Sequence, residues 1–319
     1  MKTFDVIASG YCSMDRIIKI DSQASIGKTS IILNNDNDTI YYGGCSVNVC
    51  YALSKLGMSA LPLLRVGSDY IDNGFRHYLA SGNVSIDALD LVPHEKTSNA
   101  YLIEDQESNH ITLFHPGAMD GKYANTPSQN WFEKSKIGLM TVASFEDNKI
   151  FLEACINNNL PLFLGMKMDK EAFPKAFLIE VIKYSKVIFA NESEFECICQ
   201  MLGISQIEDI FRLTQIKTIV ITLGSKGSKY YERQLDSEYV SGFVSACPVR
   251  LVIDTVGSGD AYISGFIYGY LNGLDTVTSM QFGSTLASFI IEGVGSTTNT
   301  PSLEQLKLRH KSFYRGGKK

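Results

Sequence analysis

The chain has 319 residues, of which 45% are hydrophobic, and it carries a formal net charge of −5 with a pI near 5.6. This length and apolar content are sufficient for one α/β domain with a large core. The acidic balance argues against general nucleic-acid binding, and no apolar stretch approaches the length of a membrane span. We expect a cytoplasmic protein with no membrane partner, because the first residues lead directly into a strand without a signal-peptide pattern.

The N-terminal segment predicts one buried strand followed by a small, exposed sheet. Residues 4–9 form an apolar run that is typical of a buried strand. Short alternating stretches follow at residues 16–20, 29–33 and 39–42, and polar residues and glycine separate them. This spacing predicts several short strands that lie outside the main core.

The next segment predicts two helices around a strand, and then a hairpin. Residues 46–56 and 71–80 have helical apolar spacing, and residues 61–66 between them predict a strand. Residues 99–103 and 110–114 flank a polar turn, which is typical of two antiparallel strands. We expect this hairpin to join the small sheet.

From residue 136 onward, strand-like and helix-like runs alternate regularly. Strands are predicted at 137–143, 160–164, 187–190 and 218–222, and helices at 148–157, 172–184 and 192–202. Because parallel strands are joined by crossover helices, this order predicts a parallel sheet covered on both faces. Ligands of such sheets bind beyond the carboxyl ends of the strands.

Polar residues and glycines cluster at the predicted carboxyl edge of the sheet. They follow the strands or precede the first helix, and they are Asp15, Gly43, Gly44, Asn48, Asn191, Glu194, Thr222, Gly224 and Gly227. A set of hydrogen-bonding groups at this edge predicts a ligand site there.

The most informative segment lies near the C-terminus. A β-branched run at 249–253 predicts a strand, and Gly257, Gly259 and Asp260 then lead into an apolar helix at 262–271. Free N–H groups and the positive end of a helix dipole favour phosphate at such a turn. A carboxylate beside the phosphate can deprotonate an attacking hydroxyl group. The alternative is a structural turn, in which the glycines permit tight packing and the acid interacts with the dipole.

The seven cysteines have irregular spacing and fall mostly within apolar segments. Cys197 and Cys199 are only two residues apart, but no second pair and no nearby histidine completes a tetrahedral metal site. We therefore expect free thiols rather than a metal centre.

These segments resemble the ribokinase-like (PfkB) family of carbohydrate and nucleoside kinases over nearly the whole chain. The family motif Asp-Thr-x-Gly-Ala-Gly-Asp is matched from Asp254 to Asp260, with Ser258 in place of the usual alanine. Further matches in the family's order are Gly43, Gly44 and Asn48, then Gly67, Asp69, Gly74 and Gly82, then Asn191 and Glu194, and then Thr222, Gly224 and Gly227.

The resemblance implies a three-layer αβα sandwich with a mostly parallel central sheet. It also implies one kinase domain over residues 1–319, with a small β-sheet lid formed by about residues 12–42 and 97–115. The implied reaction is transfer of the γ-phosphoryl group of ATP to a sugar or nucleoside hydroxyl group.

The resemblance also implies a role for each motif residue. Asp260 would be the general base, and the N–H groups of Gly257, Ser258 and Gly259 would bind the charge on the γ-phosphoryl group. The residues implied to bind ATP are Asn191, Thr222, Gly224 and Gly227, with Glu194 holding Mg²⁺ through water. The residues implied to bind substrate hydroxyls are Asp15, Gly43, Gly44 and Asn48. Asp254 would help to hold a monovalent cation such as K⁺.

Each motif also has a structural interpretation. Asn191 can cap the helix that follows, with Glu194 completing a capping box. The pair Gly43 and Gly44 can be a simple turn, and Asp15 can be a solvated acid. Their joint occurrence in family order favours the functional interpretation.

Two segments favour a nucleoside over a simple sugar as the acceptor. Residues 110–119 and 282–295 resemble the adenosine-kinase-like branch of bacterial nucleoside kinases. Phe114, Tyr41 and Tyr42 are candidates to stack against a base, although apolar hairpin residues also seal lids onto their domains. A ribokinase-like or fructokinase-like sugar kinase is the alternative.

The loop after the strand at 160–164 departs from its relatives. Relatives often carry an Asp or Asn followed by Pro or Arg in this loop, whereas this chain has Lys167. Its positive charge could bind an acidic or phosphorylated sugar, or it could be a solvated lysine.

A non-catalytic binding protein is disfavoured, because it would not need Asp260. A Rossmann oxidoreductase would need Gly-x-Gly-x-x-Gly after the first strand, which is absent. A homodimer through the lid is expected, since it would cover exposed strand edges.

Overall fold

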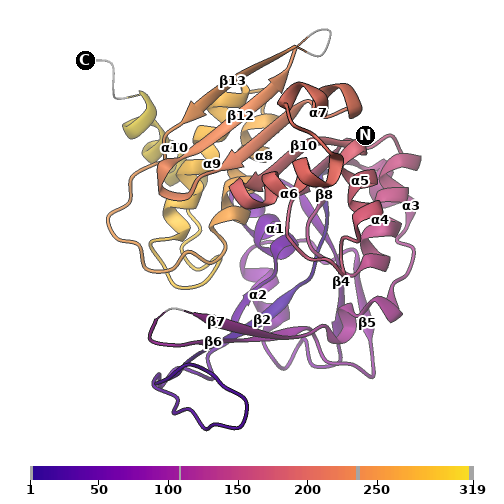
Figure 1. Cartoon of the computed structure of the whole chain (residues 1–319). Coiled ribbons are helices and arrows are strands. Elements are labelled where there is room, and N and C mark those ends of the chain that lie inside the picture. The colour runs from indigo at the N-terminus through magenta and orange to yellow at the C-terminus, as the bar shows by residue number, and fades with distance from the viewer. Residues whose placement is uncertain (1–2, 108, 235–237, 316–319) are drawn as a thin grey trace.

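The computed structural model describes residues 3–107, 109–234 and 238–315. They form a large sheet with helices on both faces, and a smaller sheet lies apart from the C-terminal helices, as Figure 1 shows. Among the described residues, no helix is both long enough and apolar enough to cross a membrane.

The nine-stranded sheet of the described chain is parallel except at one edge. Its strands in spatial order are β13 (Tyr239–Val244), β12 (Ser228–Arg233), β11 (Thr218–Thr222), β10 (Ser185–Asn191), β9 (Leu162–Gly165), β8 (Ser135–Met140), β1 (Phe4–Ser9), β4 (Ala60–Gly67) and β5 (Leu89–Val92). The pairs β11–β12 and β12–β13 are antiparallel, and the other neighbouring pairs are parallel. The parallel part confirms the strand and helix alternation that the sequence predicted.

Alternate strand residues point into two separate cores. In β10, Val187 and Phe189 pack into one core while Ile188 and Ala190 pack into the other. The helices against the first core are α1 (Cys45–Lys55), α2 (Phe75–Ser81), α8 (Ser258–Leu271), α9 (Thr276–Ile290) and α10 (Leu303–His310). The helices against the second core are α3 (Gln129–Glu133), α4 (Phe145–Asn157), α5 (Lys175–Tyr184), α6 (Glu192–Leu202) and α7 (Ile207–Leu213). The chain therefore has three layers.

The smaller sheet has the strand order β3 (Tyr41–Gly43), β2 (Ser13–Lys19), β6 (Asn99–Glu104) and β7 (His110–His115). The β6 and β7 strands pair in antiparallel fashion, which confirms the predicted hairpin and its place in the small sheet. β3 ends at Gly43 and α1 begins at Cys45, so the small sheet leads directly into the first helix that packs on the large sheet.

The strand predicted at 29–33 is wrong. Only one isolated bridge forms there, between Ile20 and Ile32, and Leu33 donates its N–H to the carbonyl of Lys19. The apolar side chains of this segment, Ile31, Ile32 and Leu33, are exposed. Without a buried face, alternation of residue types does not fix a strand.

The strand predicted at 249–253 is also wrong. Leu251, Val252 and Ile253 are each more than half exposed, with no strand beside them. The N–H of Ile253 instead donates to the carbonyl of Ile291 at 2.8 Å. β-branched composition therefore predicted a strand where the fold has an exposed loop.

Some helix boundaries differ for local reasons. The helix predicted from residue 71 begins only at Phe75, because Gly74 before it has φ of 85°. The helix predicted from residue 148 begins earlier, at Phe145, because the side chain of Ser144 caps its N-terminus. The two edge strands β5 and β13, and β12 beside β13, were not predicted.

Candidate active site

The N-terminus of α8 is built on two glycines with different tasks. Gly257 has φ of 77°, and a Cβ atom there would lie 2.4 Å from the Cβ of Ser296. This turn therefore requires glycine at position 257. A Cβ on Gly259 would meet no atom within 4 Å, so the backbone of Gly259 borders open space. A ligand can approach the N–H groups at this helix end closely.

Asp260, in the first turn of α8, is held in a chain of hydrogen bonds. Asn48 Nδ2 donates to Asp260 Oδ2 at 2.8 Å, and Ser296 Oγ donates to Asn48 Oδ1 at 2.8 Å. Burial raises the pKa of Asp260 to about 6, while Asn48, the charge of Lys167 and Cys45 act in the opposite direction. A carboxylate with this pKa is mostly ionised at neutral pH and remains a useful base.

The turn before α1 places Asn48 beside this acid. Gly44 has φ of 98°, and a Cβ there would lie 2.1 Å from the carbonyl oxygen of Tyr11. A Cβ on Gly43 would lie 2.9 Å from Ser296 Oγ and 3.0 Å from Asn48 Oδ1. The predicted residues Gly43, Gly44 and Asn48 are thus brought together with Asp260.

Asp15 approaches the same turn from the small sheet. Asp15 lies on β2 and pairs with Tyr41 of β3, and Tyr41 is two residues before Gly43. The Asp15 carboxylate accepts a hydrogen bond from the Ser13 hydroxyl group. Burial raises the pKa of Asp15, and the Ser13 hydroxyl group counteracts this effect. Asp15 is therefore a partly buried acid rather than a solvated one.

A cavity of about 240 Å³ opens at the carboxyl ends of the parallel strands. Its walls come from the ends of β9, β10 and β11 and from the start of α8. The polar and glycine residues in these walls include Lys167, Asn191, Glu194, Thr222, Gly259 and Asp260. The structure therefore gathers residues from distant motifs around one space.

Asn191 and Glu194 form a complete capping box at the start of α6. Asn191 Oδ1 accepts from the N–H of Glu194 at 2.9 Å, and Glu194 Oε2 accepts from the N–H of Asn191 at 2.8 Å. Burial raises the pKa of Glu194, whereas the Asn191 N–H and the charge of Lys167 lower it. The pair has a structural role and also faces the cavity. Carboxylate and amide oxygens are ligands that suit Mg²⁺.

The Thr222 loop divides into two parts. Thr222 lies opposite Asn191 in the sheet register and belongs to the cavity wall. Gly224 and Gly227 form the turn between β11 and β12, with φ of 57° and 118°. A Cβ on Gly227 would lie 2.2 Å from the carbonyl oxygen of Val244, so this glycine is required by packing.

Asp254 ties two loops together. Its Oδ1 accepts from the N–H of Val256 and its Oδ2 from the N–H of Gly295, both at 2.9 Å. This connection fixes the turn before α8 against residues 295–296. Among the described residues, no group of three His, Cys, Asp or Glu side chains is placed to hold a metal ion.

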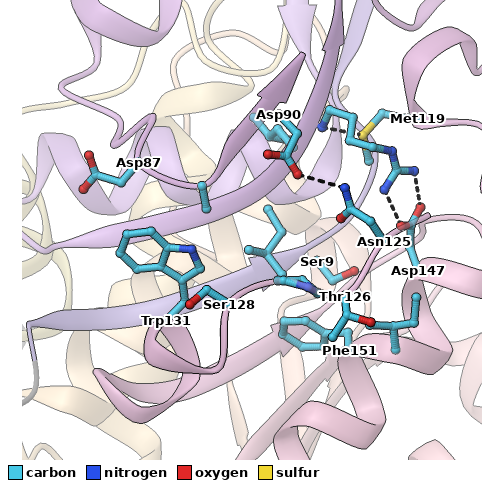
Figure 2. Close-up of a pocket in the computed structure, with 16 residues that line it drawn as sticks. Ser9, Asp87, Asp90, Met119, Asn125, Thr126, Ser128, Trp131, Asp147 and Phe151 are labelled. Carbon is cyan, nitrogen blue, oxygen red and sulfur yellow. Dashed lines mark hydrogen bonds and ion pairs between the residues drawn. The ribbon is translucent and has the colours of Figure 1, made fainter. Parts of the chain in front are cut away.

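A larger cavity of about 390 Å³ lies elsewhere, between β4, β5 and α4. Figure 2 shows Trp131, Asp90 and Asn125 around it, with Asn125 donating to Asp90 at 3.1 Å. The buried Arg65 pairs with Asp147 through two contacts of 2.5 and 2.8 Å. Arg65 and Asp147 thus neutralise each other, and no predicted motif residue lines this cavity. The smaller cavity is the better candidate for the reaction.

Two residues of the site escaped the sequence analysis. Ser296 contacts the motifs around Gly43, Asn48 and Gly257, but it lies in a loop with no periodic pattern. Cys45 lines the cavity beside Asp260, and only its place directly after Gly44 would have suggested it.

Comparisons with known proteins agree with this geometry. A family model described as pfkB family carbohydrate kinase matches residues 4–303. The nucleoside kinase of Methanocaldococcus jannaschii is 30% identical over 267 residues, which cover 83% of this chain and 84% of the relative. The nucleoside kinase of Methanothermobacter thermautotrophicus is 29% identical over 301 residues, which cover 93% of this chain and 92% of that one.

Solved structures show the same fold. The crystal structure of the M. jannaschii nucleoside kinase has a TM-score of 0.86 at 26% identity and covers 98% of this chain and 99% of its own. The Burkholderia thailandensis nucleoside kinase in complex with inosine has a TM-score of 0.84 at 22% identity, covering 96% and 98%.

Proposed function

The chain belongs to the pfkB family of carbohydrate kinases, and we propose that it transfers the γ-phosphoryl group of ATP to a hydroxyl group of a nucleoside. The predicted resemblance, the three-layer fold and an ATP-dependent kinase of sugars or nucleosides are confirmed. The preference for a nucleoside is supported by two relatives that are named nucleoside kinases. A simple sugar is the second candidate, supported by weaker similarity to 5-dehydro-2-deoxygluconokinases at 24% identity. Because the reaction uses ATP, we expect it to take place in the cytoplasm.

The position of Asp260 in the first turn of α8, where Asn48 donates to it at 2.8 Å, is the observation that carries the proposed mechanism. Its carboxylate takes the proton from the acceptor hydroxyl group as the oxygen attacks the γ-phosphorus, and the bond to ADP breaks. The N–H groups of Gly257 and Gly259 would face the developing charge at the start of α8, whereas the N–H of Ser258 donates to the carbonyl of Thr255 at 3.2 Å and would have to leave that bond to join them. The open space beside Gly259 supports this role.

We place the ATP phosphates against the carboxyl ends of β10 and β11. Asn191, Glu194 and Thr222 line the cavity there, and Glu194 would hold Mg²⁺ through water while retaining its bond to the Asn191 N–H. Bound Mg²⁺ would neutralise phosphate charge. Gly224 and Gly227 would border the remainder of the nucleotide.

We assign Lys167 to the phosphate rather than to an acidic sugar. It is exposed in the cavity wall, it forms no ion pair with any described residue, and its charge acts on both Asp260 and Glu194. An ammonium group in the cavity wall that forms no ion pair with a described residue is available to bind a phosphate. Lys167→Met should lower kcat/KM for ATP by about ten- to hundredfold. Lys170 is exposed in the same loop, so Lys170→Met is the matched control. Equal kcat/KM for ATP in the two variants would exclude a role of Lys167 in phosphate binding.

The acceptor is proposed to bind between the small sheet and α1. Register places Asp15, Ala100 and Phe114 side by side across three strands, on one face of the small sheet. Phe114 packs edge-on against Tyr11 and is 41% exposed, which leaves part of its ring for a base. Tyr42 is instead stacked on Tyr78 and therefore has a packing role. Asp15, Asn48 and the turn at Gly43–Gly44 would bind sugar hydroxyls.

The opposite face of the small sheet is proposed to bind a second copy of the chain. The cross-strand pairs Tyr101–Leu113 and Ile103–Ile111 give it an apolar surface, with Leu113 54% and Ile111 45% exposed. Residues 12–42 and 97–115 would then act as lid and interface together. Leu113→Glu should convert a dimer to a monomer in sedimentation, whereas an unchanged sedimentation coefficient would remove this interface.

The first test is Mg²⁺-dependent ADP release from ATP with adenosine, inosine, other ribonucleosides, ribose, fructose and phosphorylated sugars. One nucleoside should stimulate turnover, and Asp260→Asn should abolish the stimulation. If a free sugar stimulated turnover more than any nucleoside, the chain would be a simple-sugar kinase, the second candidate. Rapid ATP hydrolysis without any acceptor would contradict a lid that excludes water. Parallel assays with K⁺ and with a large organic cation test the proposed role of Asp254.

A further inference from the structure

Ser296 determines which end of the Asn48 side chain faces Asp260. An amide side chain can present either its oxygen or its nitrogen to a neighbour. An ionised carboxylate only accepts hydrogen bonds, so the nitrogen of Asn48 must face Asp260 for this contact to be favourable. The oxygen is then left for Ser296, whose hydroxyl group donates to it at 2.8 Å.

The packing around Ser296 leaves this hydroxyl group little freedom. Ser296 is 9% exposed, and a Cβ on Gly257 would lie 2.4 Å from Ser296 Cβ, while one on Gly43 would lie 2.9 Å from Ser296 Oγ. The neighbouring Gly295 is fixed by its N–H bond to Asp254. The loop at Ser296 therefore joins the proposed substrate turn, the proposed anion site and Asn48.

We propose that Ser296 is a positioning residue for phosphoryl transfer, which holds the Asn48 amide with its nitrogen toward Asp260. This inference rests on the proposed role of Asp260 as the base. If Ser296 loses its hydroxyl group, the Asn48 amide loses the partner that fixes its orientation. It can then rotate and present its oxygen to the carboxylate, which disfavours the ionised form.

The other groups that face Asp260 do not change in such a variant. They are Lys167, in the loop after β9, and Cys45, at the start of α1. Both remain in place when only the Ser296 hydroxyl group is removed, so a change in the pH profile would report the Asn48 contact.

The test compares Ser296→Ala with Thr298→Ala, which removes a hydroxyl group from the same loop. Thr298 bonds only to the Val294 carbonyl group among the described hydrogen bonds, and it is exposed. Ser296→Ala should move the acidic limb of the kcat profile upward by about one pH unit, which lowers kcat by about twofold at pH 7 and by about tenfold at pH 5. Thr298→Ala should leave both unchanged.

A double-mutant cycle with Asn48→Ala separates positioning from general packing. If Ser296 acts through Asn48, its replacement should change kcat at pH 5 less than twofold in the Asn48→Ala background, compared with about tenfold in the native background. An equal loss in both backgrounds would overturn the inference, as would a Ser296→Ala enzyme with native kcat and pH profile. Ser296→Gly provides a second variant without the hydroxyl group should Ser296→Ala unfold, and it should show the same pH shift. Native activity of Asp260→Asn would instead refute the proposed function itself.

Discussion

Gly257 and Gly259 lie two residues apart, and the structure predicts opposite results when each is replaced by alanine. A Cβ on Gly257 would lie 2.4 Å from Ser296 Cβ, and φ is 77°. The left-handed conformation alone costs about 1–2 kcal/mol for alanine, and the overlap adds to it. Gly257→Ala should therefore lower the melting temperature by several degrees.

Gly259→Ala should have the reverse effect on stability. The new Cβ meets no atom within 4 Å, and alanine within a helix is more stable than glycine by about 0.5–1 kcal/mol. The melting temperature should stay equal or rise. Activity should nevertheless fall by about a hundredfold or more, because the methyl group occupies the space through which phosphate approaches the N–H groups.

The assay combines thermal unfolding with initial rates of ADP release for both variants. Loss of activity in Gly259→Ala at native stability is the result that only a ligand explains. If Gly259→Ala retained turnover within about threefold of the native value, the open space beside it would have no role in phosphate binding, and the proposed anion site would be wrong.

Three further outcomes follow from the site. Because the pKa of Asp260 is about 6, kcat limited by chemistry should fall to about a tenth of its plateau at pH 5, whereas a flat profile between pH 5 and 7 would exclude this base. The folded pKa of Asp260 lies above its unfolded value, so the native state binds this proton more tightly and stability falls as pH rises from about 4 to 6. Asp260→Asn should consequently melt at a higher temperature than the native protein at pH 7, with the difference vanishing below pH 4. Glu194→Gln keeps the capping box with Asn191, so it should preserve the melting temperature while raising the Mg²⁺ concentration needed for half-maximal rate; a lower melting temperature with unchanged Mg²⁺ dependence would leave only the structural role.

The sequence predicted the parts of the site in which the backbone conformation requires glycine. Gly44 and Gly257 have positive φ and closely approached Cα atoms, so the chain carries glycine there, and the sequence displays it. The parallel strands were predictable because burial on both faces requires continuous apolar runs, as in β10. Residues 249–253 have a similar composition but form an exposed loop, since composition does not reveal whether a neighbouring strand exists.

Ser296 and Lys167 could not be assigned in advance for a different reason. Their importance comes from neighbours that are distant in the sequence, such as Asn48 for Ser296, and no local pattern encodes such a contact. The sequence singled out Lys167 but left its role open between an acidic substrate and solvent, and the phosphate assignment became possible only because Asp260 and Glu194 line the same cavity. Long-range neighbours of a motif therefore need the fold before their role can be inferred.

Asn191 and Glu194 show why a structural interpretation and a functional one need not compete. A capping box fixes both side chains at the start of α6, and it uses the Glu194 oxygen that accepts from the Asn191 N–H. Since a carboxylate has two oxygens with several lone pairs, the same fixed group can also bind water around a cation. Rigid attachment lowers the entropy lost when the ligand binds. The cap is thus a means of holding Glu194 ready at the cavity wall, and its presence strengthens the proposed Mg²⁺ role instead of replacing it.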